Sequence, residues 1–418
     1  MWGGFQPFGI SRGDRRAHIY ILGQTGTGKS TLLRSIVEQD ILQGEGCMLI
    51  DPHGDLAEAV IGLIPSWRVD DAIIIEPSDL NNPIAWNPLF HIPPDERPLV
   101  ASNLTSAFKH LWHDSWGPRL EYLLYNSLAA ILDAPDHLRP TILSVPRMLV
   151  DRSYRDAVVR TVHDPQVRQF WTSEFASWNE RFLSEIISPV QNKIGALVSA
   201  PSLRNILGQW KSTIDLGRIL SERKILVVNL SKGLIGEDKA NFLGSVLVAG
   251  FQAAAMRRAN TSEFLRDDFH LYIDEFQNFG TDSFSAMLSE SRKFHLTLTL
   301  SNQYLTQLSE EIRAATFGNV GSIVCFRVGA GDAEKLALEL ADYSRETLRN
   351  LGRGEVCVRL SQEGDAGQPF LGRTYPSPPN LGTRRMNIRS QVQQRYTVKR
   401  EIVEQRIAAW FRSTKEKI

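Results

Sequence analysis

The chain has 418 residues, of which 42% are hydrophobic and 22% are charged, an ordinary composition for a globular protein with a substantial core. Its 47 lysines and arginines balance 47 aspartates and glutamates, which excludes a uniformly basic or acidic surface, so any surface for nucleic acid must be a local patch. The cysteines Cys47, Cys325 and Cys357 are far apart and flanked by apolar residues, which favours buried thiols in a reducing compartment over a disulfide or metal framework.

The N-terminal segment, residues 1–16, has no apolar region of the kind that a secretory signal requires. Further along the chain, the longest apolar stretch, Gly244–Met256, is too short to span a bilayer. We therefore expect a soluble chain with a cytoplasmic location.

Short apolar runs near the start of the chain predict the first strands of a sheet. They are His18–Gly23, Gly46–Asp51 and Ala72–Pro77, with a helical pattern between the first two. Strands that are apolar along their whole length are typical of a parallel sheet that helices cover on both faces. We expect residues 1–97 to form the first part of such an α/β core.

The middle of the chain, residues 98–220, shows a helical pattern instead of strand-like runs. Apolar residues recur there at intervals of three and four, as in segments 119–132 and 192–207. We therefore expect an all-α insertion domain that interrupts the core. Residues 221–375 would form the second part of the core, because strand-like runs return at 224–230, 269–274, 294–302, 321–329 and 354–360.

Pro376 and the prolines that follow it mark the start of a C-terminal tail, residues 376–418. The tail holds ten lysines and arginines against three acidic residues, and residues 399–411 have a helical pattern. We expect a solvated terminal helix. A basic arm that binds DNA or a partner is the alternative.

The segment GQTGTGKST, residues 23–31, fits the pattern G-x-x-x-x-G-K-[ST] and lies between a strand and an amphipathic helix, the context of a phosphate-binding P-loop. Its glycines let backbone N–H groups point at phosphate oxygens, and the helix N-terminus adds partial positive charge. Lys29 can reach the β- and γ-phosphates, and Ser30 can ligate Mg²⁺. The expected nucleotide-binding residues are Gly23, Gln24, Thr25, Gly26, Thr27, Gly28, Lys29, Ser30 and Thr31.

A second motif places two acidic residues at the end of a strand, where His270–Ile273 leads into Asp274 and Glu275. In a P-loop protein the first carboxylate holds the Mg²⁺ shell, and an adjacent glutamate can polarise the attacking water. An apolar strand that ends in Asp-Glu is common by itself, but the P-loop upstream favours the catalytic interpretation. We assign Mg²⁺ to Ser30 and Asp274, and Glu275 favours a hydrolase over a passive nucleotide switch.

A further strand, within residues 294–302, fits beside the Asp-Glu strand and brings Gln303 near the γ-phosphate. A glutamine there can bond the phosphate and the attacking water, although it can also simply cap the strand. Arg292 precedes the strand, so it lies at the opposite end of the sheet. This position favours a finger supplied in trans to a neighbouring subunit over a solvated surface arginine. Lys293 and Arg327 are rival cations.

With these motifs in this order, the chain resembles the HerA/FtsK superfamily of DNA-pumping ATPases. Within that superfamily it most resembles the TraG/TraD-type conjugative coupling ATPases of type IV secretion. The resemblance rests on the interrupted core and on segments 23–31, 51–55 (DPHGD), 272–279 and 289–308. It implies a RecA-like P-loop NTPase core in which the strand before Gln303 lies between the P-loop strand and the Asp-Glu strand. It also implies Arg292 as the finger, and Asp51 and His53 in a loop near the site.

The resemblance further implies an ATP- and Mg²⁺-dependent homohexameric motor that translocates DNA through a central pore. A secretion, relaxase or nuclease protein would be its partner. The alternatives are a secretion-type ATPase that moves protein, or a nucleotide-ordered ring scaffold. Coupling proteins usually carry N-terminal membrane helices and HerA helicases an N-terminal barrel, but here the P-loop begins at residue 23, so neither is expected within this sequence. Either the chain is a soluble stand-alone motor, or its front end has been trimmed away. The catalytic residues would be Lys29, Glu275, Gln303 and Arg292, and candidates to line a pore are Lys193, Lys211 and Lys232.

Overall fold

The chain is built around a nine-stranded sheet in a computed structural model that describes residues 6–340, 343–376 and 385–412. The strand order is β11-β8-β7-β1-β6-β5-β2-β4-β3. Neighbours from β7 to β3 are parallel, whereas β8 and β11 are antiparallel to their neighbours. The bounds are β1 Ile19–Leu22, β2 Gly46–Asp51, β3 Ala72–Ile75, β4 Ile225–Asn229, β5 Phe269–Ile273, β6 Leu296–Asn302, β7 Ser322–Cys325, β8 Glu355–Arg359 and β11 Phe370–Arg373, with a separate hairpin of β9 Ser361–Gln362 and β10 Asp365–Ala366.

Alternate residues of the central strands enter two hydrophobic cores, one on each face of the sheet. In β2, Met48 and Ile50 pack into one core, while Cys47 and Leu49 pack into the other. Successive side chains of a strand point to opposite faces, so a strand covered on both faces must be apolar throughout. The structure thus confirms the predicted α/β core, and the three cysteines are buried and free, as the sequence predicts.

Helices cover both faces of this sheet. The face that includes Cys47 is covered by α2 Lys29–Leu42, α3 Asp55–Ile61 and part of α19 Arg385–Tyr396. The opposite face is covered mainly by helices from the second part of the chain, after β4. Its helices are α14 Glu237–Met256, α15 Asp282–Glu290, α16 Glu310–Asn319, α17 Ala330–Glu339 and α18 Arg345–Asn350. Two short helices, α1 Arg12–Arg15 and α13 Lys232–Ile235, precede β1 and α14.

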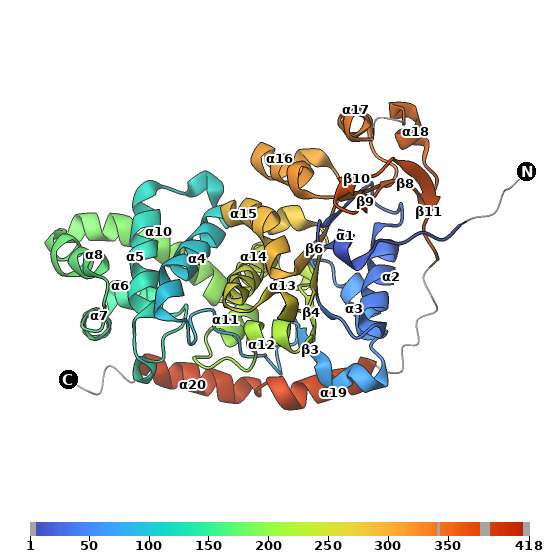
Figure 1. Ribbon diagram of the computed structural model, residues 1–418. Coiled ribbons are helices and arrows are strands. Elements are labelled where there is room, and N and C mark those ends of the chain that lie inside the picture. The colour runs from blue at the N-terminus through green and yellow to red at the C-terminus, as the bar shows by residue number, and fades with distance from the viewer. Residues whose placement is uncertain (1–5, 341–342, 377–384, 413–418) are drawn as a thin grey trace, which may run out of the picture.

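Between β3 and β4 the chain forms helices and connecting loops, and this part lies to one side of the sheet (Figure 1). Its α-helices are α4 Arg97–Leu111, α5 Pro118–Leu132, α6 Ser144–Val150, α7 Arg152–Val159, α8 Pro165–Gln169, α9 Phe175–Ser177, α10 Glu180–Val198, α11 Pro201–Leu207 and α12 Leu216–Ser221. A separate domain over residues 98–220 stays a prediction. Over the described ranges of the chain, no helix combines the length and apolar character needed to cross a membrane.

The C-terminal tail differs from the expected solvated helix. Two helices, α19 Arg385–Tyr396 and α20 Arg400–Arg412, form a strap that runs along the bottom of the molecule from the core to the helical part (Figure 1). The strap buries Val403, Ile407 and Trp410, which share one face of α20 at helical spacing. Arg147 of α6 donates a hydrogen bond to the Trp410 carbonyl at 2.7 Å. An amphipathic stripe therefore docks this helix.

Basic residues of α19 in the same strap are paired with acidic residues of the core. Arg389 forms ion pairs with Glu58 of α3 and with Glu76, which follows β3. Arg395 pairs with Asp70. These charges are neutralised within the chain, so this part of the tail does not offer the basic surface that the DNA-arm alternative requires. Residues 377–384 and 413–418 of the predicted tail lie outside the described residues.

Candidate nucleotide-binding site

The P-loop connects the carboxyl end of β1 to the first turn of α2. Gly26 and Gly28 have φ values of 78° and 123°, in the left-handed region where a side chain would strain the backbone. At Gly23 an added Cβ would lie 2.5 Å from the Cβ of Phe326, closer than carbon atoms can approach. Glycine is therefore required at each of these positions, and the loop has the backbone that phosphate binding needs.

Lys29 is the buried cation of the site. Its Nζ donates to the carbonyl oxygens of Gly23 at 2.6 Å and Gln24 at 3.4 Å. Burial lowers the pKa of Lys29, while the charges of Glu275 and Asp274 raise it. The lysine therefore lies within electrostatic reach of the predicted Mg²⁺ ligand Asp274 and of the predicted general base Glu275. The next residue, Ser30, is exposed in the first turn of α2, where a bound Mg²⁺ can reach its hydroxyl.

Asp274 is the buried carboxylate directly after β5. It accepts a hydrogen bond from the Ser301 hydroxyl and one from the Glu275 N–H at 3.2 Å. Burial raises the pKa of Asp274 to about 6, the Ser301 hydrogen bond opposes this shift, and the charges of Glu275 and Asp51 add to it. A carboxylate that is costly to ionise alone is well suited to a site that receives a divalent cation.

Asp274→Asn is expected to raise the free energy of unfolding of the nucleotide-free protein at pH 7 by about 1–3 kcal/mol. The folded pKa of about 6 exceeds the ordinary value of 3.8, so the folded state binds the proton more tightly than the unfolded state does. The protonated Asp274 therefore contributes to the stability of wild type fully at a pH below its unfolded pKa of 3.8. This contribution is lost as the pH rises through the folded pKa of about 6.

Urea unfolding at pH 4 and pH 7, without Mg²⁺ or nucleotide, measures this effect. The advantage of Asp274→Asn should be present at pH 7 and nearly absent at pH 4. The exposed Asp365 provides a matched control, and Asp365→Asn should show no such pH-dependent difference. An Asp274→Asn variant that is less stable than wild type at pH 7 would contradict the buried-charge argument.

Gln303 joins the P-loop to Glu275. It follows β6, which pairs in parallel with β1 on one side and with β5 on the other, as the resemblance implies. The Gln303 Nε2 donates to Glu275 Oε1 at 2.8 Å, and its Oε1 accepts from the Thr25 hydroxyl at 2.8 Å. The structure therefore brings together these predicted site residues from three separate segments of the chain.

The backbone of Glu275 adopts a left-handed conformation, with φ of 49° and ψ of 52°. This conformation costs a non-glycine residue about 1 kcal/mol and is common at functional sites. The buried Glu275 side chain also accepts a hydrogen bond from Gln277 Nε2 at 2.8 Å. Sequence reasoning missed both Gln277 and Ser301, although polar residues beside the Asp-Glu pair and at the tip of an apolar strand were a usable signal.

The basic residues of the sequence prediction lie at two different edges of the sheet. Arg292 is exposed in a 3₁₀ helix, Ser291–Phe294, at the amino end of β6 and thus opposite to Gln303; Lys293 is exposed beside it. Arg327, also exposed, follows β7, and its carbonyl accepts from the N–H of Gln24 at 2.9 Å. The structure does not bring Arg292 together with the P-loop of its own chain.

The predicted site-adjacent loop, residues 51–55, borders the same edge. The Asp51 carboxylate accepts from the N–H groups of His53 at 2.8 Å and Ala57 at 2.9 Å, so it fixes the loop and the start of α3. The His53 side chain is exposed. Asp51 therefore holds the loop backbone and lies close enough to Asp274 to influence its pKa.

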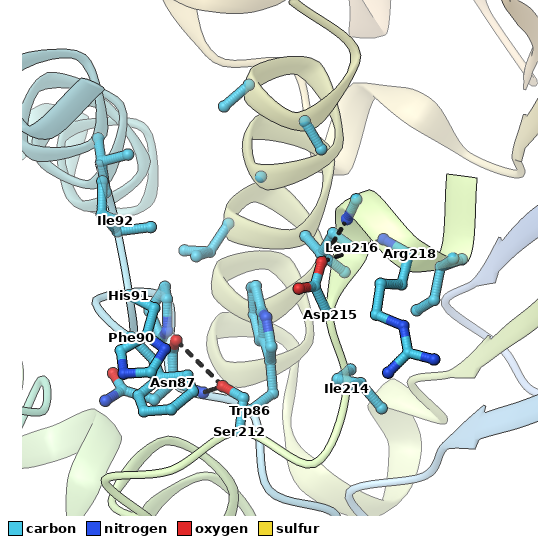
Figure 2. A pocket seen from close by; sticks show the side chains of 18 of the residues that line it. Trp86, Asn87, Phe90, His91, Ile92, Ser212, Ile214, Asp215, Leu216 and Arg218 are labelled. Carbon is cyan, nitrogen blue, oxygen red and sulfur yellow. Dashed lines mark hydrogen bonds between the residues drawn. The ribbon is translucent and has the colours of Figure 1, made fainter. Parts of the chain in front are cut away.

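A cavity of about 390 Å³ lies elsewhere, between α14, segment 86–92 and segment 212–219 (Figure 2). The P-loop residues, all of which are described, do not line it. Ser212 accepts from the Asn87 N–H at 2.9 Å, and Asp215 accepts from the Gly217 N–H at 2.8 Å. These polar groups hold the surrounding loops, whereas the predicted site residues Lys29, Glu275 and Gln303 lie at the P-loop edge of the sheet.

Comparisons with known proteins agree with this fold. Residues 14–96 match the family described as "Helicase HerA, central domain". The type 4 coupling protein DotL of Legionella pneumophila is 22% identical over 376 residues, which cover 75% of this chain and 48% of DotL. The chain thus spans about half the length of the curated relative that it matches.

Two solved structures share the fold over most of both chains. The bacterial conjugative coupling protein TrwB matches with a TM-score of 0.64 at 14% identity, covering 89% of this chain and 88% of that chain. VirB4 of Thermoanaerobacter pseudethanolicus matches with a TM-score of 0.58 at 15% identity, covering 87% and 91%. TrwB has been solved in complex with ADP and Mg²⁺ and with non-hydrolysable analogues of GTP and ATP.

The parallel sheet, the P-loop and the carboxylates at its edge define a RecA-type P-loop fold, as predicted. Within this class, the family match and the coupling-protein likenesses support the HerA/FtsK superfamily and its conjugative coupling ATPases. The resemblance drawn from the motifs is thereby confirmed.

Proposed function

We propose that this chain is one subunit of a homohexameric, ATP-hydrolysing ring that translocates DNA through its pore. The observation that carries the proposal is the Gln303 bridge, with one end on Thr25 of the P-loop and the other on Glu275. A side chain that contacts both the phosphate-binding loop and the candidate general base can couple the γ-phosphate to hydrolysis. The likeness to TrwB, described as a plasmid coupling protein, supports DNA as the cargo.

In this proposal the P-loop N–H groups and Lys29 bind the phosphates of ATP. Mg²⁺, held through Ser30 and Asp274, supplies charge neutralisation when it is bound. Glu275 orients a water molecule and accepts its proton. Gln303 exchanges its contacts with Thr25 and Glu275 for contacts with the γ-phosphate and this water. Because Gln303 directly follows β6, loss of the γ-phosphate on hydrolysis changes the position of the end of that strand.

Arg292 acts on the site of the neighbouring subunit, because it lies at the far edge of its own sheet. The arginine stabilises the charge on the transferring phosphoryl group, so each site is complete only within the ring. The proposal includes a cytoplasmic location and a secretion, relaxase or nuclease protein as partner.

The steady-state rate of ATP hydrolysis, measured against protein concentration with and without single- and double-stranded DNA, tests the proposal. The rate per subunit should rise cooperatively with protein concentration and rise further with DNA. A rate that depends on neither would overturn the DNA motor and favour a protein-moving ATPase or a nucleotide-ordered scaffold.

A further inference from the structure

The nucleotide site has two flanks, one on each side of β1. On one flank β6 pairs with β1 and with β5, and Gln303 and Glu275 come after β6 and β5. On the other flank the sheet continues with β7, β8 and β11. In the proposed function the γ-phosphate lies beside Glu275 and Gln303. A triphosphate that extends from there along the P-loop therefore places the base of the nucleotide on the flank of β7, β8 and β11.

The loop that precedes β8 lies directly against the P-loop on this second flank. The N–H of Gly354 donates to the Thr27 carbonyl at 2.9 Å. A Cβ added at Gly28 would lie 3.6 Å from the Cα of Gly354. Gly354 itself has a φ of 78°, in the left-handed region that favours glycine. The backbone of this loop thus packs against the phosphate-binding loop, and this packing fixes its distance from a bound nucleotide.

The end of β11 completes this border. β11 is antiparallel to β8, so its carboxyl end lies beside the start of β8. The Thr374 N–H donates to the Gly354 carbonyl at 2.8 Å, and the Thr374 hydroxyl donates to the same oxygen at 3.3 Å. Segments 351–354 and 374–376 therefore form one continuous border beside the P-loop, which we call the outer rim.

The outer rim presents an aromatic ring and a cation to solvent. Tyr375, next to Thr374, is 68% exposed, and Arg353, between two glycines, is exposed as well. Within the described residues, no partner forms an ion pair or a hydrogen bond with the Arg353 guanidinium. At the other end of β8, by contrast, Arg359 pairs with Glu339 at 3.2 Å. An open phenol ring and an unpaired guanidinium are groups on which nucleobases stack in proteins.

We propose that Tyr375 and Arg353 bind the base of the nucleotide by stacking on its faces. This inference rests on the proposed function and adds the residues that hold the part of the substrate that the P-loop leaves free. Segments 351–354 and 374–376 contain no side-chain amide or carboxylate, the groups that most often read the edge of an adenine or a cytosine. Stacking acts on every base, because each has a π face. The substrate class is therefore a purine nucleoside triphosphate, with ATP and GTP bound about equally.

Calorimetric titration of the full chain with Mg²⁺ and non-hydrolysable analogues of ATP and GTP, or with inorganic tripolyphosphate, tests the base contact. Tyr375→Ala and Arg353→Ala should each weaken binding of both analogues by about five- to thirtyfold and leave the affinity for tripolyphosphate unchanged. Tyr375→Phe keeps the ring and should bind the analogues as wild type does. The matched control is Tyr122→Ala, since Tyr122 is an exposed tyrosine of α5 in the helical part. Lys29→Ala should lose tripolyphosphate and both analogues alike.

The outcomes separate this inference from the proposed function. A wild type that binds neither analogue overturns the proposed function and the inference with it. Wild-type affinity for both analogues in Tyr375→Ala and Arg353→Ala overturns the inference alone. Alanine variants that lose tripolyphosphate as well would show that the outer rim supports the fold of the P-loop, which also overturns it. A preference of more than about thirtyfold for one purine would contradict recognition by stacking.

Steady-state kinetics of nucleotide hydrolysis give a second measurement. The base lies away from the transferring phosphoryl group, so its contacts are the same in the bound substrate and in the transition state. Tyr375→Ala should therefore raise KM for ATP and for GTP by about five- to thirtyfold and leave kcat unchanged. Wild-type KM together with a lower kcat in Tyr375→Ala would place the ring at the reacting phosphate and overturn the base contact.

Discussion

Arg292→Ala should lower ATP turnover by the assembled protein by about three to five orders of magnitude, the usual contribution of an arginine finger. The reason is geometric. Arg292 precedes the seven-residue strand β6, and Gln303 follows it. Such a strand is roughly 23 Å long, farther than an arginine side chain reaches. Arg292 therefore does not reach the nucleotide site of its own chain, so the proposed finger has to serve a neighbour's site, and ATP binding by an isolated subunit should persist in the variant.

Mixing experiments distinguish this role from damage to the fold. Equal amounts of Arg292→Ala and Glu275→Gln, each inactive alone, should recover part of the activity, because some interfaces pair an intact Glu275 with an intact Arg292. Lys293→Ala is the matched control, since Lys293 is the adjacent exposed cation. Wild-type turnover by Arg292→Ala, together with inactivation by Arg327→Ala, would contradict the trans finger and move the role to the P-loop edge.

The parallel core could be predicted because its cause is local. Residues 47–50 are all apolar, and the structure divides them between the two faces of the sheet, which is the condition that produces an uninterrupted apolar run. The position of β6 between β1 and β5 has no such local cause. Strand order depends on pairing between distant segments, so it followed only from the resemblance to a family with this arrangement.

The docking of the C-terminal strap is the clearest feature that sequence reasoning missed. The apolar stripe of α20 is visible in the sequence, but Arg147 and the Trp410 carbonyl that it binds are separated by 263 positions. Trp410 Nε1 likewise donates to the Leu138 carbonyl, 272 positions away, at 3.0 Å. No spacing rule connects such segments, so the sequence predicted a solvated terminal helix, with a basic arm as the alternative.

In the candidate site, too, the features with a local sequence pattern could be predicted, and those that depend on contacts between distant segments could not. P-loop residues and the Asp-Glu pair are contiguous in sequence, so their motifs predicted them. The Thr25–Gln303–Glu275 bridge depends on the register of β6 against β1 and β5, in which Leu22 pairs with Asn302 and Ile273 with Leu300. The sequence predicted Gln303 near the phosphates but not its two hydrogen-bond partners.

Glu275→Gln should lower the rate of hydrolysis by about two to four orders of magnitude, the usual contribution of a general base, while ATP binding is kept. An amide has nearly the shape of the carboxylate but cannot accept the proton of the attacking water. In wild type both oxygens of Glu275 are acceptors, one from Gln303 and one from Gln277. An amide at position 275 can satisfy only one of these donors through its oxygen.

The second donor can be accommodated if the Gln303 amide reverses, so that its oxygen accepts from the new NH₂ and its NH₂ donates to the Thr25 hydroxyl. The bridge then persists, and the loss of rate reports the missing base and not a collapsed site. Single-turnover hydrolysis and binding of a fluorescent ATP analogue separate these effects. Gln277→Ala is the control: it removes one hydrogen bond to a charged group, so it should slow hydrolysis by about tenfold to a hundredfold at most. Hydrolysis by Glu275→Gln at a tenth of the wild-type rate or more would mean that another group activates the water.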